Sequence, residues 1–165
     1  MDFVTAFKYK QWANAELLLC AQSQIQQLPE DEARFFIRIL HHTSVVDSLF
    51  ISRITGSVER YTTDNTIETP TLAELQHTMN LHDQWLVDYT LRLSAEELVR
   101  HIDFKFVDGD GGRLSVSEIL LHLLTHGSNH RGMASRVLSS HGLERPKDTY
   151  TRYLHLTEPE RRTHL

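Results

Sequence analysis

Residues 115–142 read SVSEILLHLLTHGSNHRGMASRVLSSHG, and this stretch decides the fold. Its apolar positions recur at steps of four and three, the spacing of a helix that packs one face against a core. Ser115 and Glu118 form a capping box at its start, and Gly142 marks its end. Two histidines occupy core positions where a helical bundle normally has leucines, in the series Ile119, Leu123, His126, His130, Met133 and Val137.

A second segment has the same spacing and adds a third interior imidazole, in the series Phe35, Ile39, His42, Val46 and Leu49. Burying imidazoles without partners costs free energy, and the cost grows when several lie close together and one is protonated. A divalent metal ion removes both costs, because neutral imidazole is its commonest nitrogen ligand. We therefore expect one divalent ion bound by His42, His126 and His130, with a hydrogen-bonded histidine core as the alternative.

Three further histidines fall near the predicted site. His41 is the alternative ligand to His42, but it lies beside the core series and we favour His42. His122 extends the stripe by one turn, yet four residues overshoot a helical turn by roughly 40°. We therefore expect His122 beside the site, where it is a candidate for proton relay. His82, on the core series of a predicted third helix, is the other catalytic candidate, with a hydrogen-bonded interior histidine as its alternative.

The residues around the paired histidines exclude two common classes of metal site. His126-Gly-Ser-Asn-His130 has no glutamate beside its first histidine, so it is not the metalloprotease signature, and the core series carry no Glu-x-x-His pairs of the di-iron type. An ion held by three neutral nitrogens, with open positions, lowers the pKa of a bound water or thiol. Zn²⁺, Ni²⁺ and Fe²⁺ all accept such ligands. Asp47 is expected to orient an imidazole or to accept a hydrogen bond from Arg131, with a surface position as the alternative.

The rest of the chain predicts three more long helices and several short elements. Capping boxes begin the third helix at Thr71 and a short helix at Ser94, and the glycines of residues 108–112 predict a hairpin turn. The aperiodic residues 57–70 argue against a simple up-down-up-down order. We expect one all-α domain over residues 1–165, a four-helix bundle with a small hairpin before the fourth long helix and a short C-terminal helix. The long helices are expected at about residues 2–24, 30–54, 71–93 and 115–142, and the last short helix around Tyr150.

Composition excludes several classes of protein. The 165 residues carry a formal net charge of −5 and no basic stripe, which argues against a nucleic-acid partner. Cys20 is the only cysteine, so no intrachain disulfide can form. No apolar run approaches the roughly 20 residues that cross a bilayer, and the first residues do not resemble a signal peptide. We expect a cytoplasmic protein without a membrane partner.

Four segments together resemble the DinB/YfiT-like family of small metal-binding helical bundles. They are HTSVVDSLF at residues 42–50, HLLTHGSNHRG at residues 122–132, YKQWAN at residues 9–14, and Asp148-x-Tyr150. The resemblance implies a four-helix bundle in up-down-down-up order, often a homodimer, with one divalent ion on His42, His126 and His130. It does not place His41 or His82 among the ligands.

The resemblance also implies a function, because relatives in this family include transferases and isomerases that use bacillithiol, mycothiol or glutathione. We expect a metal-dependent transferase that activates a low-molecular-weight thiol for attack on an electrophilic substrate. One alternative is a hydrolase in which the ion activates water. The other is a non-catalytic, metal-stabilised stress-response module.

Overall fold

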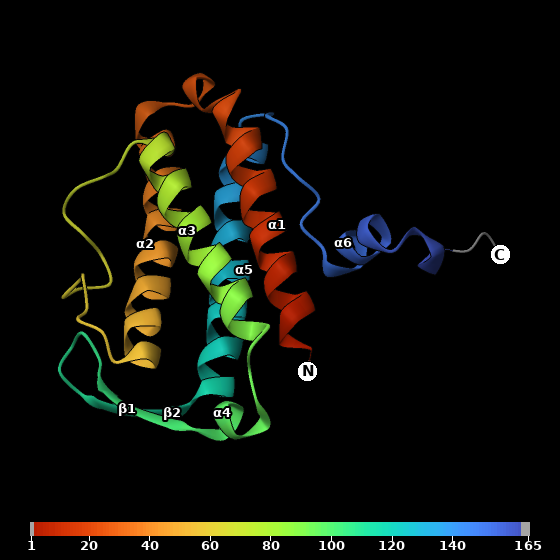
Figure 1. Ribbon diagram of the computed structural model, residues 1–165. Coiled ribbons are helices and arrows are strands. Elements are labelled where there is room, and N and C mark those ends of the chain that lie inside the picture. The colour runs from red at the N-terminus through yellow and green to blue at the C-terminus, as the bar shows by residue number, and fades with distance from the viewer. Residues whose placement is uncertain (1, 163–165) are drawn as a thin grey trace.

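The computed structural model describes residues 2–162, so residue 1 and residues 163–165 of the expected domain lie outside the described part. The described chain is mostly helical and carries one small two-stranded sheet (Figure 1). The long helices are α1 (Phe3–Gln22), α2 (Glu30–Thr55), α3 (Leu72–Thr90) and α5 (Val116–Ser140). The short elements are η1 (Ile25–Gln27), α4 (Ala95–Val99), β1 (His101–Lys105), β2 (Gly111–Ser115), α6 (Tyr150–Thr157) and η2 (Pro159–Arg161).

Side chains at the helix starts explain the helix boundaries. The predicted capping boxes of α3 and α5 are confirmed: Thr71 and Ser115 each accept a hydrogen bond from the backbone N–H three residues later, where a glutamate returns the bond. Asp2 caps α1 by accepting from the N–H of Thr5. The helix α2 ends at Gly56, whose φ of 69° is the left-handed conformation that glycine adopts at little cost.

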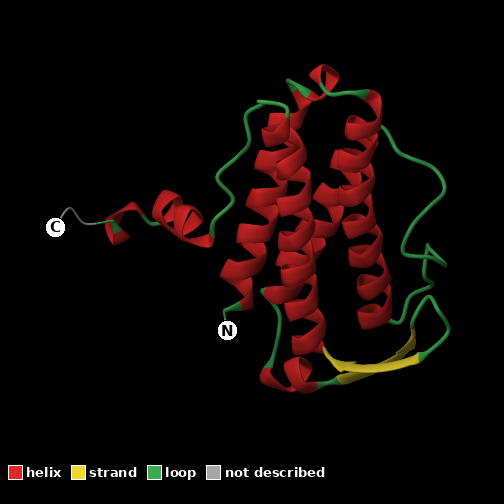
Figure 2. Cartoon of the chain, turned by 180° about the vertical axis from the view of Figure 1, so that it is seen from behind, coloured by secondary structure: helices red, strands yellow, loops and turns green. Residues whose placement is uncertain are grey.

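The sheet is an antiparallel hairpin that lies across one end of the long helices (Figure 2). Its register pairs His101 with Ser115 and Lys105 with Gly111. Gly109 has a φ of 96° in the turn, as the glycine-rich sequence predicted. The return strand begins at Gly111, inside the turn predicted at residues 108–112, because the ladder continues through Gly111 and Gly112.

The four long helices lie side by side. In Figure 1, α1 and α5 run in one direction and α2 and α3 in the other. The helix α1 packs against α3 and α5, and α2 packs against the same two helices. Residues 57–70 return along the outside of α2 to reach the start of α3 (Figure 1).

The interior has two apolar clusters with a polar layer between them. The cluster at the hairpin end includes Phe7, Val46, Leu86, Ile102 and Leu123. The cluster at the other end includes Leu17, Leu40, Met79, Ala134 and Leu138. Between these positions every long helix contributes buried polar residues, namely Lys10, Asn14, Thr43, Ser44, Asp83 and Arg131.

The predicted core positions of Phe35 and Met133 are wrong. Phe35 is 43% exposed and Met133 is 40% exposed, whereas their neighbours Phe36 and Ala134 are fully buried. The physical reason is that α2 and α5 each pack against two helices. The buried face of each helix is therefore wider than the predicted core series. Its centre lies one residue away from that series on both α2 and α5.

A candidate metal centre in the polar layer

Three histidines converge from two neighbouring helices. His42 comes from α2, and His126 and His130 come from successive turns of α5. One ring nitrogen of each lies within 4.8 Å of those of the other two. The Nε2 atom of His126 is 3.1 Å from Nε2 of His42 and 3.0 Å from Nε2 of His130. The three residues are half-buried, so the cluster is partly accessible to solvent.

These separations match the ligand spacing of a metal ion. Two imidazole nitrogens bound at 2.0–2.1 Å, with angles between tetrahedral and octahedral values, lie about 2.9–3.4 Å apart. The two Nε2 separations of 3.1 and 3.0 Å fall in this interval. Two of the three nitrogen pairs therefore have the spacing of ligands to one ion, and the third pair, from His42 and His130, lies within 4.8 Å.

The tautomer of His42 is fixed by the backbone. Its Nδ1 atom lies 2.8 Å from the carbonyl oxygen of Asp64, in the segment between α2 and α3. A carbonyl oxygen only accepts hydrogen bonds, so Nδ1 carries the proton. In a neutral imidazole this leaves a lone pair on Nε2, directed at the other two histidines.

Hydrogen bonds among the three rings leave the cluster incompletely satisfied. His126 Nε2 faces two nitrogens at once, and a single proton cannot align well with both contacts. The Nδ1 atoms of His126 and His130 are buried and have no partner among residues 2–162. A shared cation on the Nε2 side would satisfy all three lone pairs.

Burial disfavours the protonated form of His126. Together with the smaller effects of the neighbouring His130 and His42, it lowers the pKa of His126 to about 3. The pKa of His130 is also lowered, by burial first and then by His42. Neutral imidazoles are the form that binds metal ions, and these two pKa shifts favour that form in His126 and His130.

The structure distinguishes His41 from His42, the two residues that the sequence offered as alternative metal ligands. His41 points to the segment between α2 and α3, where its Nε2 atom lies 3.1 Å from the hydroxyl of Thr66. Arg38 holds the same segment by donating to the carbonyl oxygens of Thr66 at 2.6 Å and Ile67 at 3.2 Å. The hydrogen bonds of His41 and Arg38 thus hold in place the segment whose backbone orients His42.

A largely apolar pocket of about 400 Å³ opens beside the cluster, between α2, α5 and the hairpin. His122 lines it and stacks on His126, with ring centroids 5.2 Å apart and planes 27° apart. Its nitrogens are not among the clustered ligand atoms, in keeping with the expected place beside the site. Residues that share the pocket with His122 include His42, His126, Phe50, Phe106 and Leu114, and the charged side chains in its lining are Arg53, Asp64 and Glu118.

His82 lies elsewhere in the polar layer. Its Nδ1 atom is 3.1 Å from the hydroxyl of Ser44, and His82 does not line the apolar pocket. Burial is the main cause that lowers its pKa to about 4, and the charge of Lys10 adds to the effect. A hydrogen-bonded interior histidine describes this geometry, and a catalytic function of His82 stays a prediction.

The sequence model of the DinB family matches residues 2–162. The chain belongs to the DinB family. The match covers all of the long helices, and with them the three converging histidines of this DinB protein. A search of the curated proteins finds no relative that matches. Within residues 2–162 no helix combines the length and the apolar composition needed to cross a membrane.

The polar layer of this DinB protein also holds a buried charge network that the sequence reasoning missed. The Lys10 ammonium donates to Asp47 and to Asp83, each at 2.7 Å, and all three side chains are almost completely buried. Asn14 donates to the second oxygen of Asp83 at 2.7 Å. The expectation that Asp47 orients an imidazole or pairs with Arg131 is wrong for its described contacts, because the Lys10 ammonium occupies that place.

The network continues toward the C-terminal segment. Arg131 donates to Asn14 at 3.2 Å and to Asp148 at 2.7 Å, and Tyr9 also donates to Asp148. The sequence spacing could have indicated this network. Lys10 and Asn14 lie on the same buried face of α1 as Phe7 and Leu17, at helical steps of three and four.

Gly127 makes room for the network next to the metal ligands. A Cβ atom at Gly127 would lie 3.3 Å from Lys10 Cε and 3.5 Å from an Arg131 nitrogen. The cost of a helical glycine, about 1 kcal/mol relative to alanine, is therefore matched by the close approach of two buried cations to α5.

Proposed function

We propose that this protein binds one divalent ion through the Nε2 atoms of His42, His126 and His130 and transfers a low-molecular-weight thiol to an electrophilic substrate. The observation that carries the metal proposal is the pair of Nε2 separations, 3.1 and 3.0 Å, that join His126 to His42 and to His130. A bound ion of this kind would lower the pKa of a thiol, so that the thiolate is available near pH 7. Zn²⁺, Ni²⁺ and Fe²⁺ all suit three imidazoles.

The apolar pocket supports the second part of the proposal. It opens directly beside His42 and His126, and Phe50, Phe106 and Leu114 offer an apolar surface to an organic substrate. Excluding water from this surface favours a sulfur nucleophile over hydrolysis. The pocket would hold the electrophilic carbon close to the ligand cluster.

In this proposal His122 would take the thiol proton. It lines the pocket and stacks on His126, and burial lowers its pKa, so it is neutral near pH 7 and free to accept a proton. With 1-chloro-2,4-dinitrobenzene as the probe substrate, the sulfur forms a bond to the ring carbon as the carbon–chlorine bond breaks. Chloride leaves, and the thiol proton passes to a ring nitrogen of His122 and then to water.

Metal content tests the first part. The full chain, purified without a histidine tag, should contain close to one equivalent of a divalent ion by elemental analysis. The change His126→Ala should reduce the metal to background, and the matched control His77→Ala, at an exposed position of α3, should not. Equal metal content in wild type and His126→Ala would overturn the site.

Turnover tests the second part. The metal-loaded protein should consume 1-chloro-2,4-dinitrobenzene only when a thiol such as glutathione, cysteine or bacillithiol is present, and His126→Ala should abolish this activity. Thiol-independent turnover would favour a hydrolase. Stoichiometric metal without turnover on any thiol would favour a metal-stabilised stress-response module.

We also propose that the four long helices form a single domain as an up-down-down-up bundle. The packing of α1 and α2 each against both α3 and α5 supports this order. The homodimer and the cytoplasmic location stay predictions, and sedimentation and cell fractionation of the full chain would test them.

A further inference from the structure

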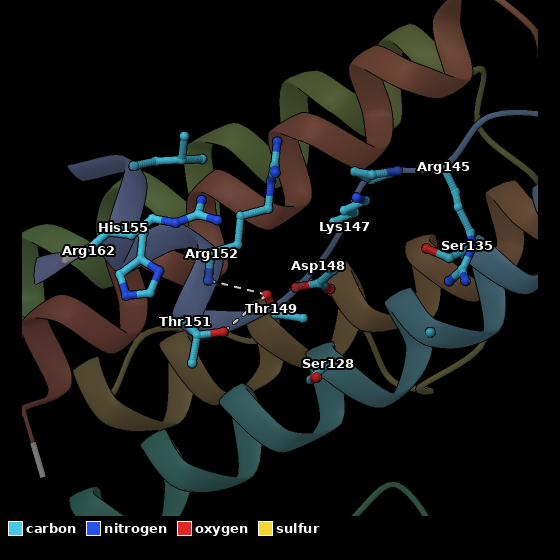
Figure 3. A pocket seen from close by; sticks show the side chains of 13 residues that line it. Ser128, Ser135, Arg145, Lys147, Asp148, Thr149, Thr151, Arg152, His155 and Arg162 are labelled. Atoms are coloured by element: carbon cyan, nitrogen blue, oxygen red, sulfur yellow. Dashed lines mark hydrogen bonds between the residues drawn. The ribbon is translucent and has the colours of Figure 1, made fainter. Parts of the chain in front are cut away.

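A second concavity lies away from the histidines, between α5 and the C-terminal segment (Figure 3). Its volume is about 910 Å³, larger than that of the pocket beside the metal centre. Ser128, Gly132 and Ser135 form its α5 wall. At 100° per residue these positions lie about half a turn around α5 from His126 and His130, so the groove and the histidine cluster are on opposite sides of the helix.

Cationic side chains surround this groove. Arg145, Lys147, Arg152 and Arg162 line it, and none of the four forms a salt bridge or a side-chain hydrogen bond within residues 2–162. Figure 3 shows Arg145 at one end of the groove and Arg162 at the other. This local excess of positive charge contrasts with the formal net charge of −5 of the whole chain.

The one carboxylate that lines the groove does not neutralise these cations. Asp148 lies between the two ends (Figure 3), and it pairs with the buried Arg131 at 2.7 Å. Tyr9 donates to the same carboxylate. The charge of Asp148 is therefore offset from inside the protein, and the four outer cations remain available to a ligand.

The groove is preformed because its outer wall is anchored to the helices. Tyr150 and Tyr153 of α6 pack against Tyr9 of α1 with ring centroids 5.4 and 5.9 Å apart. Trp12 contacts Tyr153 at 5.7 Å, which adds a second aromatic partner on α1. These contacts and the Asp148 ion pair hold the segment that carries the cations at a fixed distance from α5.

The lining chemistry matches phosphoryl groups. Arginine forks bind phosphate oxygens through paired, charge-assisted hydrogen bonds, and the hydroxyls of Ser128, Thr149 and Thr151 add neutral donors. Cations at both ends of the groove require a ligand with more than one anionic group. The volume is within the range of small-molecule sites, and the confinement of the charge to one groove does not suit a nucleic-acid strand.

We propose that this groove binds a small molecule that carries two or more linked phosphoryl groups. Such a ligand spans Arg145 and Lys147 at one end and Arg152 and Arg162 at the other, with the serine and threonine hydroxyls between. The proposal is independent of the metal centre, because no residue of the groove belongs to the histidine cluster.

Calorimetric titration of the full chain in 0.15 M NaCl tests the proposal, with inorganic triphosphate and ATP as probes and adenosine as the uncharged control. We expect one equivalent of triphosphate or ATP to bind and adenosine not to bind. The double change Arg145→Gln and Arg152→Gln should weaken binding by at least about tenfold, because it removes two donors of charge-assisted hydrogen bonds. Arg113→Gln, which removes one positive charge from the exposed hairpin, should leave the affinity unchanged.

Four results would overturn the proposal. They are the absence of triphosphate binding at millimolar concentration, equal weakening by Arg113→Gln, and tighter binding of a single-stranded oligonucleotide than of triphosphate. The fourth is a self-association that the double variant abolishes, which would assign the groove to an interface between copies. The variant His126→Ala separates the two sites: triphosphate binding that it abolishes would belong to the metal centre and not to the groove.

Discussion

The Nδ1 atom of His42 lies 2.8 Å from the main-chain carbonyl oxygen of Asp64. This contact joins a predicted metal ligand on α2 to the segment between α2 and α3, so that segment fixes the tautomer of the ligand. Arg38 in turn holds the segment through the carbonyl oxygens of Thr66 and Ile67. We therefore predict that the metal affinity of the proposed site depends on Arg38, although Arg38 contacts the segment and not the three histidines.

Arg38→Gln should lower the metal affinity by about tenfold, because loss of partners behind a ligand typically costs 10–100-fold. Competition with a chromogenic chelator measures the dissociation constant. Arg34→Gln is the matched control, one helical turn away on the exposed surface of α2. An unchanged dissociation constant in Arg38→Gln would show that the segment does not position His42.

Metal removal should lower the melting temperature of the protein without unfolding it. At a free metal concentration 100 times the dissociation constant, binding contributes about 2.7 kcal/mol, which corresponds to about 5–10 °C of melting temperature for a chain of this size. The helical circular dichroism signal should survive chelation, because apolar clusters pack on both sides of the polar layer. Loss of that signal would instead indicate an ion that is required for folding.

Local interactions made the helix boundaries predictable from sequence. A capping box needs only residues three apart, so Thr71 with Glu74 and Ser115 with Glu118 could be read directly. The pairing of His126 with His130 is equally local, because one helical turn brings both rings to one side of α5.

Longer-range features could not be read in this way. Lys10 and Asp83 are distant in sequence, and a charged residue on an apolar stripe is normally assigned to the surface until its partner on another helix is known. The polar layer, the apolar pocket and the basic groove all depend on packing between elements. For the same reason the centre of the buried face of α2 moved from Phe35 to Phe36.

Removal of the buried ammonium should destabilise the protein strongly. Lys10→Met leaves Asp47 and Asp83 buried without their cation, and breaking a buried ion pair from one side costs about 3–5 kcal/mol. Urea denaturation of the metal-free chain measures the loss. Adding Asp47→Asn and Asp83→Asn to Lys10→Met should restore part of the stability, because both unpaired charges are then removed. If Lys10→Met alone were as stable as the wild type, that result would contradict the buried network.

His82 should make the metal-free protein less stable in acid. Burial lowers its folded pKa to about 4, whereas an unfolded histidine titrates near 6.5. Between these values the unfolded chain binds more protons than the folded one, so the free energy of unfolding rises with pH across this window and levels off above it. The slope from one such group approaches about 1.4 kcal/mol per pH unit. His82→Gln, which keeps a polar group near Ser44, should flatten the profile measured by urea denaturation from pH 4.5 to 7.5. Parallel profiles for the two proteins would place His82 in solvent instead of the interior.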